Sequence, residues 1–259
     1  MDAATRNLQL YNSDQGVGTY AAASEATPVE RQLFQRFAAD FGAGLVLDLG
    51  VGAGRTTAAL AALSGRYHGI DYAPAMVAAC QRRFAAQPEL MFSHGDARRL
   101  DGIADGAAAA VVFSFNGIDS VGPDDRLAVL AAVRRVLRPG GLFLFSAHNR
   151  AFQGIPRSPG WQWTLRPRGL ARQALMWWNH LRVRRDEVET PDYAMLNDIA
   201  HHFASLFYYI DRDAQCRQLA AAGFSDCQVF NSRGEMLPAT AVDTGNDPHL
   251  HYAVRRPMD

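Results

Sequence analysis

An apolar run followed by a glycine-rich turn most strongly constrains how this chain can fold. Residues 45–54 read LVLDLGVGAG, a predicted strand that carries Asp48 near its end and glycines at every second position after it, Gly50, Gly52 and Gly54. Glycine has no Cβ and adopts positive φ at little cost, so this turn lets the backbone pass close to a ligand. A helix that starts directly after the turn aims free N–H groups at the same place. The stretch therefore predicts a nucleotide-like ligand beyond the end of a strand.

Strand and helix patterns alternate along the first 150 residues. Thr27, Pro28 and Glu30 give a helix start, with a threonine cap, proline in the first turn and glutamate three residues after the cap. An apolar stripe at every fourth residue continues that helix to position 41. The predicted strands are 45–49, 67–70, 90–93, 108–115 and 142–146, and the later helices are 55–63, 74–84 and 124–137. This alternation is typical of a doubly wound parallel sheet with helices on both faces.

Residues 150–205 interrupt the alternation. All four tryptophans lie there, and positions 149 to 185 carry eight arginines without an acidic residue. We interpret the segment as an inserted cover with one or two helices over the ligand end of the sheet. It can recognise an anionic or aromatic acceptor, contact RNA, or be a solvated helix whose underside packs through Leu175, Trp178 and Leu181.

The pattern resumes after the insertion. A short strand over 206–210 and a helix over 211–222 precede two strands, 226–230 and 251–255, that we expect to form a closing hairpin. The expected fold class is thus α/β: a doubly wound, Rossmann-like, mostly parallel seven-stranded sheet with a C-terminal antiparallel hairpin and an inserted cover after strand five. The expected segments are an N-terminal arm or lid over 1–26, a ligand-binding core over 27–149, the cover over 150–205, and completion of the sheet over 206–259.

Composition narrows the function classes. The 26 basic residues, all arginine, balance 26 acidic ones, so the formal net charge is zero and implies no bulk attraction to nucleic acid or membrane. Cys80, Cys216 and Cys227 are scattered and lack metal-ligand spacing, which fits a reducing compartment. The first ten residues, MDAATRNLQL, lack a signal-peptide pattern, and we find no apolar run of a membrane span's length. We expect a cytoplasmic protein without a metal or a membrane partner.

Polar residues stand at the ends of five predicted strands. They are Asp48, Asp71, Asp96, Asn116 and His148. Ligands of open α/β sheets bind beyond the carboxyl ends of the strands, so five polar ends together predict a site there.

Four stretches in order give the chain a family resemblance. They are the turn at 45–54, GIDYAPAMV at 69–77, HGDARRL at 94–100 and VLRPGGLFLFSAHN at 136–149. Together they resemble a class I S-adenosylmethionine-dependent methyltransferase, closely over 28–149 and loosely after 206. The resemblance implies that S-adenosylmethionine is the cofactor, that methyl transfer is the activity, and that 27–149 bind the cofactor.

The resemblance also implies roles for single residues. Asp71 would accept both ribose hydroxyls, Asp96 would accept from the adenine amino group beside the Ala97 N–H, and Tyr72 and Met76 would flank the purine. The arm around Tyr20 would close over the cofactor. The expected cofactor-binding residues are Asp48, Gly50, Gly52, Gly54, Asp71, Tyr72, Met76, Asp96, Ala97, Phe115 and Tyr20.

Each of these assignments has a structural alternative. Asp48 can hydrogen-bond the turn itself, Asp71 can cap the following helix, and Asp96 can be a turn residue. Tyr72 and Met76 can be core residues.

Methyl transfer needs the acceptor placed in line with the methyl group, and a base only where the acceptor must lose a proton. His148 is the expected base or acceptor-orienting group, with a strand cap as the alternative. Asn116, Asn149, His202 and Tyr208 are the expected acceptor-binding residues, and for His202 and Tyr208 the alternative is a core or surface residue, which is the more common case.

A small-molecule acceptor, anionic or aromatic and methylated at O or N in specialised metabolism, is the preferred reading. RNA or protein methylation is the first alternative, and nucleic acid is disfavoured because Ser114-Phe115-Asn116-Gly117 stands where amine-methylating enzymes of bases carry Asn/Asp-Pro-Pro-aromatic. An NAD(P)-dependent oxidoreductase is disfavoured because Arg55 replaces the third fingerprint glycine. A non-catalytic nucleoside-binding module is the remaining alternative.

Overall fold

The computed structural model describes residues 7–8, 11–13, 18, 20, 25–161, 164, 166–240 and 243–258. Most of the predicted arm over 1–26 lies outside these residues, as does Trp163. The described strands are β1 (Leu45–Leu49), β2 (Arg66–Asp71), β3 (Met91–His94), β4 (Ala108–Phe113), β5 (Leu137–Asn149), β6 (Val188–Glu189), β7 (Tyr193–Asn197), β8 (Leu206–Ile210), β9 (Ser225–Phe230) and β10 (His249–Arg255).

The described helices follow the expected alternation up to β5. They are α3 (Pro28–Arg36), α4 (Ala38–Gly42), α5 (Thr57–Ala61), α6 (Pro74–Arg83), α7 (Pro123–Val136), α8 (Pro167–Val183) and α9 (Arg212–Ala221), with short 3₁₀ turns η1 (Gly117–Ser120), η2 (Arg184–Asp186) and η3 (Ala200–Phe203). The predicted capping box is present at α3, where Thr27 Oγ1 accepts from the Glu30 N–H at 3.2 Å and Glu30 Oε2 accepts from the Thr27 N–H at 2.7 Å.

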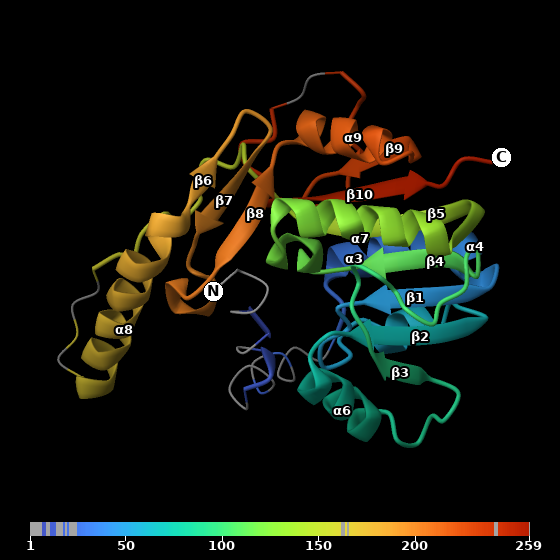
Figure 1. Cartoon of the computed structure of the whole chain (residues 1–259), viewed down its shortest axis with the longest axis horizontal. Coiled ribbons are helices and arrows are strands. Elements are labelled where there is room, and N and C mark those ends of the chain that lie inside the picture. The colour runs from blue at the N-terminus through green and yellow to red at the C-terminus, as the bar shows by residue number, and fades with distance from the viewer. Residues whose placement is uncertain are drawn as a thin grey trace.

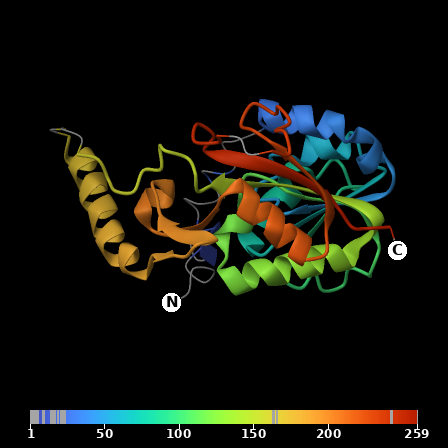
Figure 2. The same ribbon diagram turned by 90° about the horizontal axis from the view of Figure 1, so that it is seen from above.

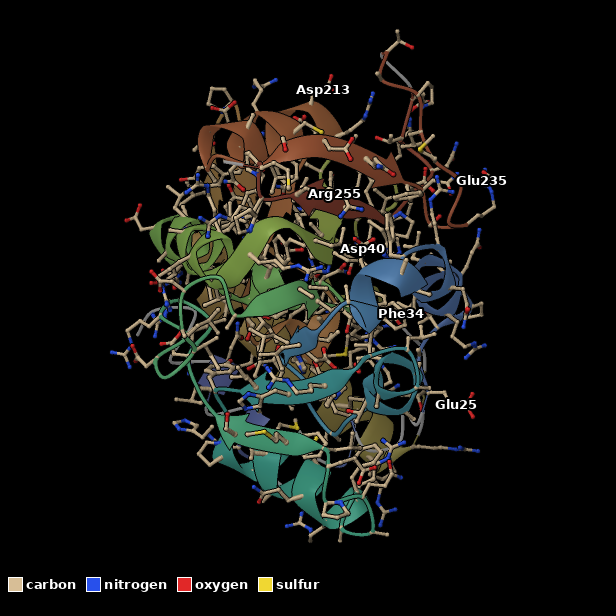
Figure 3. All side chains as sticks on the ribbon, turned by 90° about the vertical axis from the view of Figure 1, so that its right-hand side faces the viewer. Glu25, Phe34, Asp40, Asp213, Glu235 and Arg255 are labelled. Atoms are coloured by element: carbon tan, nitrogen blue, oxygen red, sulfur yellow. The ribbon has the colours of Figure 1, made fainter. Side chains whose placement is uncertain are left out.

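The α/β class and the mostly parallel sheet are confirmed (Figure 1). Strands β3, β2, β1, β4 and β5 run parallel in that order, β10 pairs antiparallel with β5, and β9 pairs antiparallel with β10. The closing antiparallel hairpin is thus confirmed as well. An ion pair of 2.6 Å between Arg255 and Asp40 ties β10 to α4 (Figure 3).

Successive residues of the buried strands point to opposite faces of the sheet and pack in two separate hydrophobic cores. Val111 of β4 packs on the side of α7 and α9, whereas Val112 packs on the side of α3, α4 and α5. This alternation explains why β4 is buried along its whole length and why helices cover both faces (Figure 2).

The sheet differs from the prediction in having ten described strands rather than seven. Strand β8 pairs with β5 only at His148 and Asn149, beyond the last β4–β5 pair at Phe113 and Phe145. Strand β8 therefore pairs with β5 where the pairing of β4 with β5 has ended. Strand β7 pairs antiparallel with β8, and β6 pairs antiparallel with β7. This extension stands beyond the carboxyl ends of the parallel strands. The insertion therefore contains two strands besides α8, which helical patterning alone does not reveal.

Other expected features are also corrected. Leu175, Trp178 and Leu181 do not form the packed underside of the inserted helix, because 47%, 58% and 53% of their surfaces are exposed. Two of the cysteines are not scattered in space, since the Sγ atoms of Cys216 on α9 and Cys227 on β9 lie 2.9 Å apart.

Within the described residues, no helix is both long enough and apolar enough to cross a membrane. The same residues contain no group of three or more His, Cys, Asp or Glu side chains arranged to hold a metal ion.

Candidate active site

A cavity of about 410 Å³ opens at the carboxyl ends of β1, β2, β4 and β5. Its volume lies in the range of small-molecule sites, about 300–1,000 Å³. Eleven of the residues expected at a site line it: Gly50, Gly52, Asp71, Tyr72, Met76, Asp96, Ala97, Phe115, Tyr20, Asn116 and His148. Residues expected to bind the cofactor and residues expected to contact the acceptor therefore line the same cavity.

The glycine turn forms one wall of the cavity. Gly50 and Gly52 have φ of +59° and +56°, and a Cβ on Gly50 would meet the Phe113 ring at 2.7 Å. The Gly52 N–H donates to Asp71 Oδ2 at 2.8 Å, which ties the turn to the end of β2. Gly54 does not line the cavity, because a Cβ there would meet the Phe84 ring at 2.6 Å, on the side of α6.

Asp48 lies beneath the turn rather than on the cavity. Its Oδ2 accepts from Thr56 Oγ1 and from Tyr67 Oη, each at 2.7 Å, and the side chain is fully buried. Burial raises the pKa of Asp48 to about 6. These contacts give it the structural role of supporting the turn.

Asp71 is the buried carboxylate that faces the cavity. Besides the Gly52 N–H, it accepts from the Ala73 N–H through Oδ1 at 2.8 Å. Burial raises its pKa to about 6, although these hydrogen bonds oppose that rise. A carboxylate offers about four acceptor positions, so Asp71 can still accept from ligand hydroxyls.

Asp96 lines the cavity with its carboxylate already engaged. Arg98 donates to it through Nε at 2.9 Å and Nη2 at 2.6 Å, and reaches Asp125 through Nη1 at 3.0 Å. Burial alone would raise the pKa of Asp96, but the bonds from Arg98 hold it below its usual value. Any bond to an adenine amino group must therefore share this carboxylate with Arg98.

Four buried polar atoms of cavity-lining residues have no hydrogen-bond partner among the described residues: Tyr72 Oη, Asn116 Oδ1, His148 Nδ1 and His251 Nε2. Buried polar groups are normally satisfied, so such a concentration indicates a polar ligand. The set of carboxylate, amide, phenol and imidazole groups fits a nucleoside with an amino-acid tail and a polar acceptor beside it.

His148 lines the cavity and lies against the buried carboxylate of Asp119, which follows β4 in the sequence. Asp119 Oδ2 accepts from the His148 backbone N–H at 2.6 Å and lies 2.9 Å from its Nδ1, without an aligned ring N–H bond. Arg126, fully buried, donates to the other oxygen of Asp119. The His148 ring stacks on Tyr209 with centroids 4.8 Å apart. These contacts fix the imidazole at the cavity wall.

Arg55 and Glu30 form a second buried pair on the cavity. Arg55 Nη2 donates to Glu30 Oε1 at 2.7 Å, and the guanidinium stands 4.8 Å from the centroid of the Phe115 ring. Burial alone would raise the pKa of Glu30, but its bonds from Arg55 and Thr27 lower it. Arg55, which stands where a dinucleotide fingerprint has its third glycine, is thus held in an ion pair with Glu30 of α3.

Aromatic rings from the N-terminal segment and from η3 also line the cavity. The Tyr11 ring contacts those of Tyr20, Tyr72 and His201 edge-on, at centroid distances of 5.6, 6.0 and 5.6 Å. Tyr20 Oη lies 3.4 Å from His201 Nε2. Tyr11 and His201 were not among the predicted site residues; the tyrosines of the polar N-terminal segment were the available signal for the first.

Three expected acceptor-binding residues lie off the cavity. Asn149 is buried and donates through Nδ2 to the carbonyls of Thr244 and Asp247 at 2.8 and 2.9 Å. The Tyr208 ring packs under the Arg126 guanidinium, 4.4 Å away. His202 turns away in a kink with φ of +58°, which leaves its neighbour His201 on the cavity.

Comparison with known proteins agrees with this geometry. Residues 46–141 match the family described as a methyltransferase domain. A demethylmenaquinone methyltransferase from Beutenbergia cavernae is 43% identical over 96 residues, 37% of this chain and 37% of that protein. Across four curated relatives, the aligned segments span between 37% and 48% of those proteins.

Two solved structures share the fold over most of the chain. The glycopeptide N-methyltransferase MtfA, in complex with S-adenosylmethionine, has a TM-score of 0.57 at 20% identity and covers 88% of this chain and 94% of its own. The amino pentose methyltransferase CalS10 from Micromonospora echinaspora, also bound to S-adenosylmethionine, has a TM-score of 0.57 at 18% identity, over 92% and 95%. At such identities the likeness concerns the fold.

The fold is therefore shared with methyltransferases whose structures hold S-adenosylmethionine. Residues 46–141 match the methyltransferase-domain family, so this stretch of the chain is a methyltransferase domain.

Proposed function

We propose that this chain is an S-adenosylmethionine-dependent methyltransferase that methylates a small-molecule acceptor at oxygen or nitrogen, in specialised metabolism. The observation that carries the proposal is the shared cavity, onto which Gly52 and Asp71 face together with His148. Methyltransferases of similar fold are named for a glycopeptide and for an amino pentose in calicheamicin biosynthesis.

The cofactor supplies an electrophilic methyl group on a sulfonium. We assign the ribose hydroxyls to Asp71, the purine to the surfaces of Tyr72 and Met76, and its amino group to Asp96 and Ala97. Residues 27–149 then form the cofactor-binding core, and 1–26 a lid that brings Tyr11 and Tyr20 over it. The insertion over 150–205 contributes Ala200 and His201 to the cavity wall.

His148 would take a proton from an acceptor hydroxyl or ammonium. Asp119 acts as a positioning residue, because it fixes the His148 backbone and lies beside its Nδ1. Phe115 and Asn116 follow β4 and would flank the space between cofactor and acceptor. The main requirement remains placement, since oriented reactants gain most of the rate.

The other classes fit the cavity less well. A dinucleotide-binding turn needs a third glycine for close packing of helix on strand, and Arg55, paired with Glu30, stands at that position. The arginine-rich helix α8 does not line the cavity, so it does not extend an acceptor site.

Methyl transfer from radiolabelled S-adenosylmethionine to a panel of phenolic, amino-sugar and peptide acceptors tests the proposal. We expect label in at least one small acceptor and none in bulk RNA or protein. Label in RNA or protein alone would contradict the proposed acceptor class.

A further inference from the structure

Helix α8 has one anchored face and one open face. Gln173, His180 and Val183 are buried on the anchored face. His180 Nδ1 lies 2.8 Å from Asn197 Oδ1 at the end of β7, and Asn179 Nδ2 donates to the His202 carbonyl of η3 at 3.0 Å. These polar contacts fix the rotation of the helix and so determine which residues point outward.

The open face is apolar. Leu170, Ala174, Trp178 and Leu181 follow at i, i+4, i+8 and i+11, so they share one side of the helix, and Leu175 lies beside them. All are exposed, Leu170 at 49% and Trp178 at 58%. Figures 1 and 2 both place α8 at the outer limit of the molecule, away from the main sheet. A contiguous exposed apolar face of this kind marks an interaction surface.

Positive charge borders this face without compensation along the helix. Arg168, Arg172 and Arg182 are exposed on one flank of the apolar face. Because positions 149 to 185 hold no acidic residue, nothing on α8 neutralises them. The guanidinium of Arg182 stands over the Trp178 ring, 5.1 Å from its centroid, at the border of the two zones. An apolar face with leucine and tryptophan beside arginines is the pattern of helices that lie in a membrane interface.

We propose that α8 is an interfacial helix that docks on an anionic lipid surface. The leucines and Trp178 enter the boundary between headgroups and acyl chains, while the arginines meet lipid phosphates. The net charge of zero does not oppose this docking, because charges more than about 10 Å apart are largely screened at 0.1 M salt. Only the local charge of α8 acts at the surface.

Two other occupants of this face are less favourable. A two-fold dimer through α8 would place the same arginines of both copies against each other, with no carboxylate on either helix to pair with them. RNA would use the arginines and Trp178 but would leave the exposed leucines against a charged backbone. A lipid surface satisfies the apolar and the cationic parts together.

Co-sedimentation of the full chain with vesicles tests the proposal. We expect binding to phosphatidylcholine vesicles that contain phosphatidylglycerol, weaker binding at high salt, and little binding to phosphatidylcholine alone. Replacing both Trp178→Ser and Leu181→Ser should weaken binding about tenfold or more, because each loses buried apolar area. Arg168→Gln with Arg172→Gln should remove most of the preference for anionic vesicles.

The matched control is Leu127→Ser, a leucine equally exposed at 51% on α7. It should bind vesicles like the unaltered chain, and circular dichroism melting should show that all variants are folded. The proposal is overturned by absent binding to anionic vesicles, or by α8 variants that bind like the Leu127→Ser control. A dimer in sedimentation velocity that the Trp178→Ser and Leu181→Ser pair dissociates, or RNA binding without vesicle binding, also overturns it.

Discussion

Asp71 links the glycine turn to the cavity at the scale of a single residue. It accepts from the Gly52 and Ala73 N–H groups at 2.8 Å each and faces the space assigned to the cofactor ribose. The charged carboxylate therefore stabilises the turn and provides hydrogen-bond acceptors for a ligand. We expect Asp71→Asn to weaken binding of S-adenosylhomocysteine about ten- to a hundredfold in calorimetry, as charge-assisted hydrogen bonds are lost.

The same carboxylate gives a pH dependence. Burial raises the pKa of Asp71 to about 6, so it is mostly charged at pH 7.5 and mostly protonated at pH 5. Affinity for S-adenosylhomocysteine should therefore fall as the pH drops through about 6. Asp48, whose pKa is also raised to about 6, is the control: Asp48→Asn should keep the pH dependence and Asp71→Asn should lose it. The reverse pattern would assign the titration to Asp48 beneath the turn.

His148 is the proposed general base, and its removal should affect catalysis more than cofactor binding. Since a positioned general base contributes about 10²- to 10⁴-fold, His148→Ala should lower kcat at least about a hundredfold with little change in cofactor affinity. His202→Ala is the matched control, because His202 lies off the cavity. Steady-state kinetics with an accepted substrate check both. An unchanged kcat in His148→Ala would refute the base.

Sequence reasoning found the parts of the site that are local in the chain. Gly50, Gly52 and Asp71 follow from the strand ends and the turn. Glu30 and His251 reach the cavity through contacts between distant segments: Glu30 arrives on α3 and His251 on the last strand, opposite Ser146. His202 and Tyr208 lie off the cavity, His202 in a kink of the backbone and Tyr208 with its ring against Arg126.

The N-terminal segment contributes aromatic residues to the cavity and should therefore strengthen cofactor binding. The described residues Tyr11 and Tyr20 line the cavity, and their rings are 5.6 Å apart. If the aromatic contacts of Tyr11 and Tyr20 contribute about 1 kcal/mol each, a chain lacking residues 1–26 should bind S-adenosylhomocysteine about thirtyfold more weakly. Tyr11→Ala with Tyr20→Ala in the full chain should reproduce much of that loss. Calorimetry that gives unchanged affinity for both would contradict the lid.

At the same scale, the sequence predicted the parallel strands better than the sheet extension. Runs such as Ala108–Phe113 are apolar enough to indicate buried strands. Val188–Glu189 is only two residues long and exposed, and Tyr193–Asn197 becomes a strand by pairing with β8. Such edges depend on tertiary pairing rather than on local propensity.

Binding of S-adenosylhomocysteine should raise the free energy of unfolding of the whole molecule. A ligand that binds only the folded state at 100 times its Kd stabilises it by about 2.7 kcal/mol. For a chain of this size we expect S-adenosylhomocysteine at that excess to raise the Tm by about 5–10 °C. Differential scanning fluorimetry checks the shift. Asp71→Asn should show a much smaller one at the same ligand concentration.

We infer that the cavity beyond the glycine turn holds one nucleoside with an amino-acid tail. Isothermal titration calorimetry of the full chain with S-adenosylhomocysteine, beside NADH, tests it most directly. We expect saturable one-to-one binding of S-adenosylhomocysteine and no heat of binding with NADH. Binding of NADH without S-adenosylhomocysteine would contradict it.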